Sequence, residues 1–180
     1  RHPDIAMARE KEPHMFDDDE AFGSGVPDFA RYHDQWGESL GRRRCGEATP
    51  IYCWWPPAAP RIRDYNPAMI WVLLLREPAS RAYSHWNMER SWGVEPQPFE
   101  AALDREMRDL IERPGFYAKP GPFQARGFYA QQLERLYALF PREQFLVLRS
   151  DWLRNDPART IGRVLAFLGV GPMGPTEAIE

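Results

Sequence analysis

The segment LLLREPASRAYSHW, residues 73–86, joins an apolar run to a polar one through Arg-Glu-Pro. The apolar run spans residues 69–75 without a break, which predicts a strand covered on both faces, as in a parallel sheet. Pro78 suits the first turn of a following helix, which we expect to continue to about Arg90. A buried strand, a sharp turn and a helix in this order indicate an α/β fold.

The same alternation continues along the chain. We expect further strands at 4–8, 45–49 and 144–149, and helices at 29–40, 59–65, 99–113, 128–139 and 157–168. The last helix has the clearest limits, because Asp156 is suited to its N-cap, Pro157 to its first position and Gly169 to its end. The pattern predicts one α/β domain, residues 1–180, with a mainly parallel central sheet and helices on both faces.

Composition excludes several classes of protein. The 180 residues are 43% apolar and 27% charged, which is typical of a soluble globular domain, and the net charge of −3 gives no overall attraction to nucleic acid. The longest apolar run is too short for a membrane span, and the N-terminal residues lack the apolar core of a signal peptide. Two cysteines make neither a disulfide framework nor a metal quartet, so we expect reduced thiols and a cytoplasmic protein.

Arg76 and Ser84 are candidates for binding a phosphate. Ligands of parallel sheets bind beyond the carboxyl ends of strands, next to helix N-termini with free N–H groups. Arg76 is the first residue after the predicted strand, and Ser84 lies two helical turns further on. A guanidinium there grips phosphate through paired hydrogen bonds. The alternative is that Arg76 pairs with a structural carboxylate and Ser84 is a surface residue. For Arg81 and His85 we expect a solvated helix face.

Four segments together resemble the sulfotransferases that use 3′-phosphoadenosine 5′-phosphosulfate (PAPS), especially the heparan sulfate sulfotransferase-like group and its bacterial relatives. In chain order they are HPDIAMAREKEPHMFD, GEATPIY, LLLREPASRAYSHW and RGFYAQQLERLYALFPREQFLVLRSDWLRNDPARTIGRVLAFLGV. The resemblance extends along nearly the whole chain. It implies a fold like that of the P-loop NTPases and the transfer of a sulfuryl group to a hydroxyl or amine of an acceptor, a carbohydrate or a small molecule.

The resemblance also implies a role for particular residues. Glu12 matches the family's catalytic base, which takes the acceptor proton. His14 and Asp17 match positions that contact the acceptor, and Arg76 with Ser84 matches the pair that holds the 3′-phosphate of the donor. PAPS is then the co-substrate, and no metal is needed. From the residues alone, Glu12 is indistinguishable from a solvated loop carboxylate.

The chain departs from the family pattern in three places. The family's glycine-rich phosphate loop lies just before the His-Pro-Asp segment, which is residues 2–4 here, and no Gly-x-x-Lys-x-Gly-Thr pattern occurs elsewhere. The family's basic loop follows Phe-Leu-Gly, residues 167–169, near the end of the sequence. Ala48 replaces a lysine of the glycosaminoglycan enzymes, which concerns the acceptor. We expect residues 1–180 alone to bind the donor weakly, because the loop supplies a cradle of N–H groups and a cation.

Two other functions fit parts of the sequence. A degenerate, non-catalytic nucleotide-binding module would keep the 3′-phosphate site alone. A nucleotide kinase-like phosphoryl transferase would need a magnesium-binding carboxylate after a strand, and Glu77 is poorly placed because it leads into a proline. We expect the acidic run 17–20 to be a solvated turn and not a metal site, and the arginines at 42–44 to be a charged lead-in to a strand. The sequence fixes neither the acceptor nor the oligomeric state.

Overall fold

The computed structural model describes residues 2–23, 25, 27–41, 44–113, 115, 118–119 and 121–173. Its strands are β1 (Ile5–Met7), β2 (Arg44–Gly46), β3 (Trp71–Leu75) and β4 (Phe145–Arg149). They form two parallel pairs, β1 with β2 and β3 with β4. The parallel pairing and the alternation with helices confirm the α/β class.

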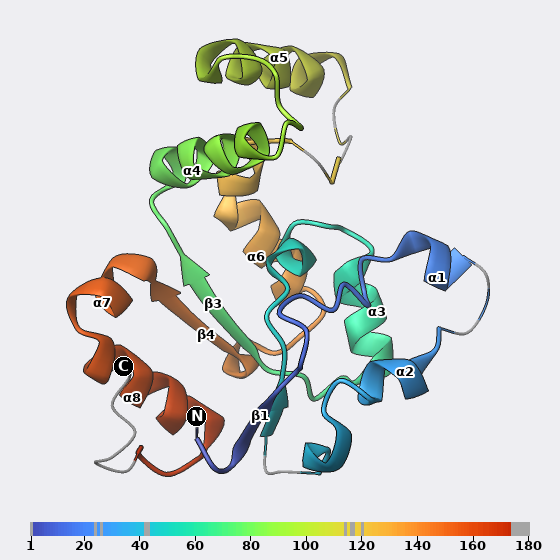
Figure 1. Ribbon diagram of the computed structural model, residues 1–180, viewed down its shortest axis with the longest axis vertical. Coiled ribbons are helices and arrows are strands. Elements are labelled where there is room, and N and C mark those ends of the chain that lie inside the picture. Colours follow the sequence, from blue (N-terminus) through green and yellow to red (C-terminus); the bar gives the residue numbers. More distant parts are fainter. Residues whose placement is uncertain are drawn as a thin grey trace.

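The helices surround these strands unevenly. They are α1 (Asp19–Gly23), α2 (Phe29–His33), α3 (Ala58–Tyr65), α4 (Pro78–Ser91), α5 (Phe99–Glu112), α6 (Tyr129–Tyr137), α7 (Ser150–Asn155) and α8 (Pro157–Leu168), with 3₁₀ turns η1 (Gly37–Ser39), η2 (Pro50–Cys53), η3 (Ala125–Gly127) and η4 (Arg142–Gln144). Figure 1 shows α4 and α5 extending beyond the carboxyl end of β3, with α7 and α8 beside β4. No helix in the described residues is long and apolar enough to cross a membrane.

β3 is covered on one face only. Trp71 and Leu73 are each 8% exposed and point into the core, whereas Val72 and Leu74 are 41% and 46% exposed. The prediction that both faces of this strand are buried is therefore wrong for the described chain. A continuous apolar run shows that a strand is hydrophobic, but it does not show which neighbouring elements are present to cover each face.

Several predicted element limits need correction. β2 ends at Gly46, three residues before the expected end, because Pro50 opens η2 instead of continuing an extended chain. The expected helix at 29–40 is divided into α2 and the short η1. The last helix has the predicted limits, since the Asp156 carboxylate accepts the Arg159 N–H at 3.0 Å and Gly169 adopts a left-handed φ of 67°.

An aromatic cluster forms the centre of the core next to β1 and β2. The Phe16 ring is 1% exposed, and its centroid lies 5.4 Å from that of Tyr32, 5.6 Å from Tyr52 and 5.3 Å from Tyr65. These rings come from the loop after β1, from α2, from η2 and from α3. The loop that carries Phe16 is therefore fixed to the core at its middle.

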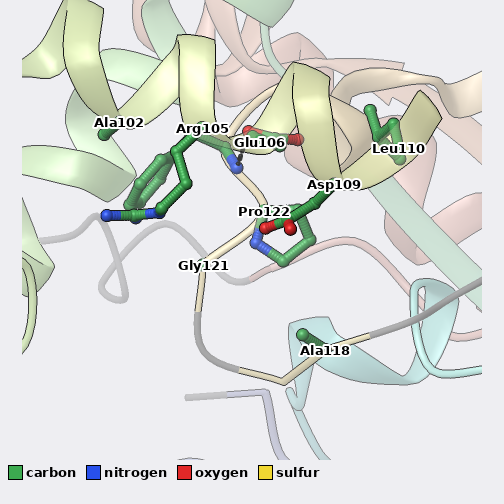
Figure 2. A pocket seen from close by; sticks show the side chains of 9 residues that line it. Ala102, Arg105, Glu106, Asp109, Leu110, Ala118, Gly121 and Pro122 are labelled. Atoms are coloured by element: carbon green, nitrogen blue, oxygen red, sulfur yellow. Dashed lines mark hydrogen bonds between the residues drawn. The ribbon is translucent and has the colours of Figure 1, made fainter. Parts of the chain in front are cut away.

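The apolar side of α5 is only partly covered. Ala102 is fully buried, with Phe99 and Leu103 packed beside it, whereas Met107 and Ile111 are 43% and 71% exposed. Glu106 is buried at 6% exposed. The Glu106 carboxylate accepts three consecutive backbone N–H groups, those of residues 123, 124 and 125, at 2.6–2.9 Å. Figure 2 shows α5 lying over the segment that contains Gly121 and Pro122. A buried carboxylate bound in this way holds that segment against the helix.

Replacing Glu106 by Gln should destabilise the protein by about 2 kcal/mol, because an amide nitrogen in place of one carboxylate oxygen leaves buried N–H groups without an acceptor. Urea unfolding measures the change. Glu112→Gln is the control, since Glu112 lies on the same helix but is exposed. Equal stability of the two variants would contradict the structural role of Glu106.

Candidate functional site

The segment after β1 brings together three of the predicted site residues. His14 Nδ1 lies 3.1 Å from both carboxylate oxygens of Asp17, and His14 Nε2 lies 3.7 Å from Glu12 Oε2. The Asp17 side chain is 7% exposed, whereas those of Glu12 and His14 are 32% and 51% exposed. One carboxylate therefore lies inside the protein and the other faces solvent, with an imidazole between them.

His14 has an unusual backbone conformation. Its φ is 54°, and among the described residues no other non-glycine residue has a positive φ. Such a conformation costs on the order of 1–3 kcal/mol and is retained where surrounding contacts enforce it. Here the Phe16 N–H donates to the Tyr52 hydroxyl at 3.3 Å, the Phe16 carbonyl accepts from Arg61 at 3.0 Å, and Lys119 donates to the Asp17 carbonyl.

The acidic run 17–20 is not the solvated turn expected from the sequence. Asp17 is buried and bound to His14. Asp18 accepts the N–H groups of residues 20 and 21, both at 3.0 Å, and so begins α1. Asp19 pairs with Arg61 at 2.8 Å and accepts from the Trp55 indole at 3.0 Å. The three consecutive aspartates therefore have different partners: a histidine ring, the N-terminal N–H groups of α1 and an arginine.

Arg76 lines a cavity of about 390 Å³ at the carboxyl ends of β3 and β4. The two ends coincide because Leu75 pairs in register with Arg149. The cavity wall consists of Leu75, Arg76, Glu77, Pro78, Ser80, Tyr129, Arg149, Ser150, Asp151 and Arg154. The Asp151 carboxylate binds Arg149 at 3.0 and 2.5 Å. The wall thus carries three arginines and the two carboxylates of Glu77 and Asp151, an excess of one positive charge that favours an anion.

The N-terminus of α4 is already capped by its own carboxylate. Glu77 accepts the N–H groups of Ala79 at 2.8 Å and Ser80 at 2.7 Å. Hydrogen bonds from Ser80 and Ala79 hold the pKa of Glu77 below its ordinary value. The expectation that these N–H groups are free to bind a phosphate is wrong, because both already donate to the Glu77 carboxylate. Ser80 lines the cavity with Arg76, whereas Ser84 is exposed one turn further along α4, and its phosphate role stays a prediction.

Arg81 and His85 do not form the solvated face predicted for them. The His85 side chain is 10% exposed and its Nε2 lies 3.0 Å from Glu89 Oε1, while Arg81 donates to the Phe123 carbonyl. Burial, with the nearby positive charges of Arg126 and Arg81, lowers the pKa of His85 to about 4. The i,i+4 spacing of His85 and Glu89 was visible in the sequence, but the segment that covers them was not.

The covering segment connects α4 to the loop that carries Asp17. Burial lowers the pKa of Arg126 to about 10, and its side chain donates to the Lys119 carbonyl. The Lys119 side chain in turn donates to the Asp17 carbonyl, and Glu89 accepts the Gly121 N–H at 3.0 Å. Charged contacts therefore run from α4, which follows Arg76, to the Glu12–His14–Asp17 group.

Trp54 and Trp55 are adjacent in the sequence but lie in different environments. Trp54 is 6% exposed and its indole N–H donates to the Ala118 carbonyl at 3.0 Å, so this ring packs inward. Trp55 is partly exposed, and Lys119 Nζ lies 4.6 Å from its ring centroid. Phe116 and Tyr117 lie outside the described residues, as do Arg42 and Arg43 of the basic lead-in to β2.

A second, smaller cavity lies between α5 and the segment 118–123 (Figure 2). Its volume is about 120 Å³, and none of the five predicted site residues lines it. Binding sites for small organic ligands have volumes of about 300–1,000 Å³. The larger cavity beside Arg76 is the better candidate for a nucleotide.

The fold and the site together define an α/β protein with a basic cavity at parallel strand ends and a histidine held between two carboxylates. Residues 62–179 match the family model described as "Sulfotransferase domain". This match covers more than half of the chain, so the protein belongs to the sulfotransferase domain family.

Relatives and solved structures agree with this assignment. The chain is 29% identical over 169 residues to heparan sulfate glucosamine 3-O-sulfotransferase 6 of Mus musculus, covering 94% of this chain and 46% of the relative. It is 36% identical over 107 residues to bifunctional heparan sulfate N-deacetylase/N-sulfotransferase 4 of Mus musculus, covering 56% of this chain and 12% of that protein. The chain thus spans about half the length, or less, of the curated relatives it matches.

Among solved structures, the crystal structure of a sulfotransferase from Alicyclobacillus acidocaldarius matches with a TM-score of 0.79 and 27% identity, covering 99% of this chain and 77% of that one. The sulfotransferase domain from the curacin biosynthetic pathway matches with a TM-score of 0.54 and 15% identity, covering 81% of this chain and 45% of that one, which concerns the fold alone. The predicted fold class and family are confirmed.

His85 should make stability depend on pH. Its pKa is about 4 in the folded protein and 6.5 ordinarily, so the unfolded chain binds the proton first as pH falls. The stabilisation is complete above pH 6.5 and is lost as pH falls towards 4, a loss of about 3 kcal/mol. Urea unfolding of wild type and His85→Gln at several pH values measures it, and the variant should have a shallower slope. His2→Gln, at a partly exposed position remote in sequence from α4, controls for removal of a histidine. An unchanged slope in His85→Gln would exclude the effect.

Proposed function

We propose that this chain is the catalytic part of a sulfotransferase that uses PAPS as donor and a hydroxyl or amine of a carbohydrate or small molecule as acceptor. The observation that carries the proposal is the contact of Glu12, His14 and Asp17 within one anchored segment of a sulfotransferase-family chain. Membership of the sulfotransferase domain family supports a transfer reaction. The two carboxylates and the imidazole are the groups that can take a proton from an acceptor and orient it.

Glu12 acts as the general base in this proposal. Its carboxylate is accessible to an acceptor, because the side chain is about one-third exposed beside a largely exposed His14. Glu12 removes the proton of the acceptor hydroxyl or amine while the new bond to sulfur forms and the bond from sulfur to the phosphate oxygen breaks. His14 and Asp17 orient the acceptor, and the buried Asp17 carboxylate fixes the imidazole ring of His14.

Arg76 holds the donor in this proposal. PAPS supplies an activated sulfuryl group when bound. The cavity at the ends of β3 and β4 fits its phosphates in charge, since Arg76, Arg149 and Arg154 line it and outnumber the two carboxylates of the wall. The predicted partner Ser84 would add a hydroxyl from the exposed side of α4, and Ser80 is a nearer hydroxyl on the cavity wall.

A carbohydrate is the acceptor class that the relatives favour. Their names place the sulfuryl group on the glucosamine of heparan sulfate. In this chain Ala48 is exposed where the resemblance leads us to expect a lysine in glycosaminoglycan enzymes. With alanine in place of that lysine, the site has one positive charge fewer to attract an acidic polysaccharide. A less charged sugar or a small molecule is therefore the favoured acceptor.

Replacing Glu12 by Gln should lower sulfuryl transfer by about 10²-fold or more, because general-base catalysis is lost while the side chain keeps its size. Donor affinity should stay unchanged. The assay follows labelled donor in the full-length protein with a carbohydrate panel, and calorimetry measures nucleotide binding. Glu10→Gln is the control, since Glu10 is exposed two residues away. Full activity in Glu12→Gln would remove this residue from its role.

Replacing Arg76 by Ala should weaken binding of the desulfated nucleotide by about 1.5–3 kcal/mol, the value of a charged hydrogen bond. Isothermal titration of the full-length protein measures the affinity. Arg108→Ala on the exposed side of α5 removes an equal charge away from the cavity and should bind as the wild type does. If the two variants bound nucleotide equally, Arg76 would not be a donor ligand.

A further inference from the structure

Glu47 lies directly after β2, and three hydroxyl groups surround its carboxylate. Tyr32 and Tyr52 both hydrogen bond to it, and Thr49 Oγ1 lies 3.5 Å from its Oε2. Tyr32 and Tyr52 are 7% and 5% exposed. A half-buried carboxylate surrounded by three hydroxyl groups is not a surface group, and no role was predicted for it from the sequence.

Tyr52 connects this carboxylate to the predicted catalytic segment. Its hydroxyl oxygen accepts the Phe16 N–H at 3.3 Å. The same hydroxyl contacts Thr49 and Glu47, and of these two Glu47 is the group that can only accept its proton. A phenol has a single proton, so donation to Glu47 turns the oxygen lone pair towards Phe16. The three groups form a directed series in which Glu47 orients Tyr52 and Tyr52 holds the backbone of Phe16.

Phe16 is the residue whose position decides that of its polar neighbours. It precedes Asp17 and lies two residues after His14, whose φ of 54° needs outside support. Tyr32 also donates to Glu47, but it meets Phe16 only through ring packing, with centroids 5.4 Å apart. The two tyrosines therefore share an acceptor, and Tyr52 is the one that bonds the backbone of the segment.

Glu47 also interacts electrostatically with Asp17 of the predicted site. Burial raises the pKa of Glu47, and the negative charge of Asp17 raises it further, against the lowering effect of the surrounding hydroxyls. The groups that face Glu47 are Tyr52 from η2, Tyr32 from α2, Tyr65 from α3, Thr49 and Asp17. Asp17, the partner of His14, is the charged group among them, so Glu47 lies within electrostatic reach of the predicted site.

We infer that Glu47 is a positioning residue for sulfuryl transfer, which acts through Tyr52 to fix the Phe16 backbone and with it His14, Asp17 and Glu12. This inference rests on the proposed function. It assigns a task to the Glu of Gly-Glu-Ala-Thr-Pro and to the Tyr that follows five residues later. Neither side chain needs to touch the acceptor or the donor.

Three single variants in the full-length protein test the inference. Tyr52→Phe and Glu47→Gln should lower kcat by roughly 10- to 100-fold with an unchanged KM for the donor, because a misplaced base slows transfer without affecting the Arg76 cavity. Tyr32→Phe is the matched control, since it removes the same hydroxyl from the same carboxylate and should keep nearly full kcat. The double variant Tyr52→Phe/Glu47→Gln should be no slower than Tyr52→Phe alone, as expected for residues acting in series.

Hydrogen exchange of the Phe16 amide gives a readout that is independent of activity. Exchange should be faster in Tyr52→Phe and Glu47→Gln than in wild type, and unchanged in Tyr32→Phe. Equal exchange and equal kcat in Tyr52→Phe and Tyr32→Phe would overturn the inference. A wild-type protein that transfers no sulfuryl group would instead overturn the proposed function, and the exchange data would still decide whether Glu47 and Tyr52 position the segment.

Discussion

The burial of the Phe16 ring is the constraint on which the site depends. Its side chain is 1% exposed among Tyr32, Tyr52 and Tyr65, and the polar residues around it in the chain must take positions compatible with that burial. Fully burying an aromatic ring is worth about 1.5–3 kcal/mol, enough to offset the strain expected for His14. An apolar anchor thus holds a strained polar loop, and the acids within it have fixed positions before any ligand binds.

Buried charge serves a second purpose, the attachment of α4 and α5 to the rest of the fold. Glu106 binds three backbone N–H groups, Glu89 binds His85 and the Gly121 N–H, and Arg81 binds the Phe123 carbonyl. Burying charge is costly unless every group has partners. These charges are bonded mostly to backbone, so they fix the positions of residues 121 and 123–125 more closely than apolar packing would.

Local sequence determined what could be predicted. The limits of α8 follow from Asp156, Pro157 and Gly169, and the family motifs predicted the fold. The role of Glu12 was predicted from the resemblance and stays a prediction. Contacts between distant residues were out of reach. The burial of Arg81 depends on Phe123, 42 residues away. The environment of Glu47 depends on Tyr32 and Tyr52, which lie before and after it in the sequence. The capping of α4 by Glu77 could have been predicted from local sequence, because a carboxylate just before Pro78 is suited to an N-cap. From the sequence, a phosphate was instead predicted at this helix N-terminus.

The two halves of the site are connected by close packing as well as by charge. Gly127 lies so close to the start of α4 that a Cβ there would come within 3.1 Å of Pro78 Cβ, a tighter contact than side chains usually make. Tyr129 completes the contact, as its hydroxyl donates to the Arg76 carbonyl at 2.9 Å. The Arg-Gly-Phe-Tyr segment thus holds Arg76 from one side. Its Arg126 donates to Lys119, which binds the loop of Asp17, so the backbone at the Arg76 cavity and at the Asp17 loop is fixed by one continuous set of contacts.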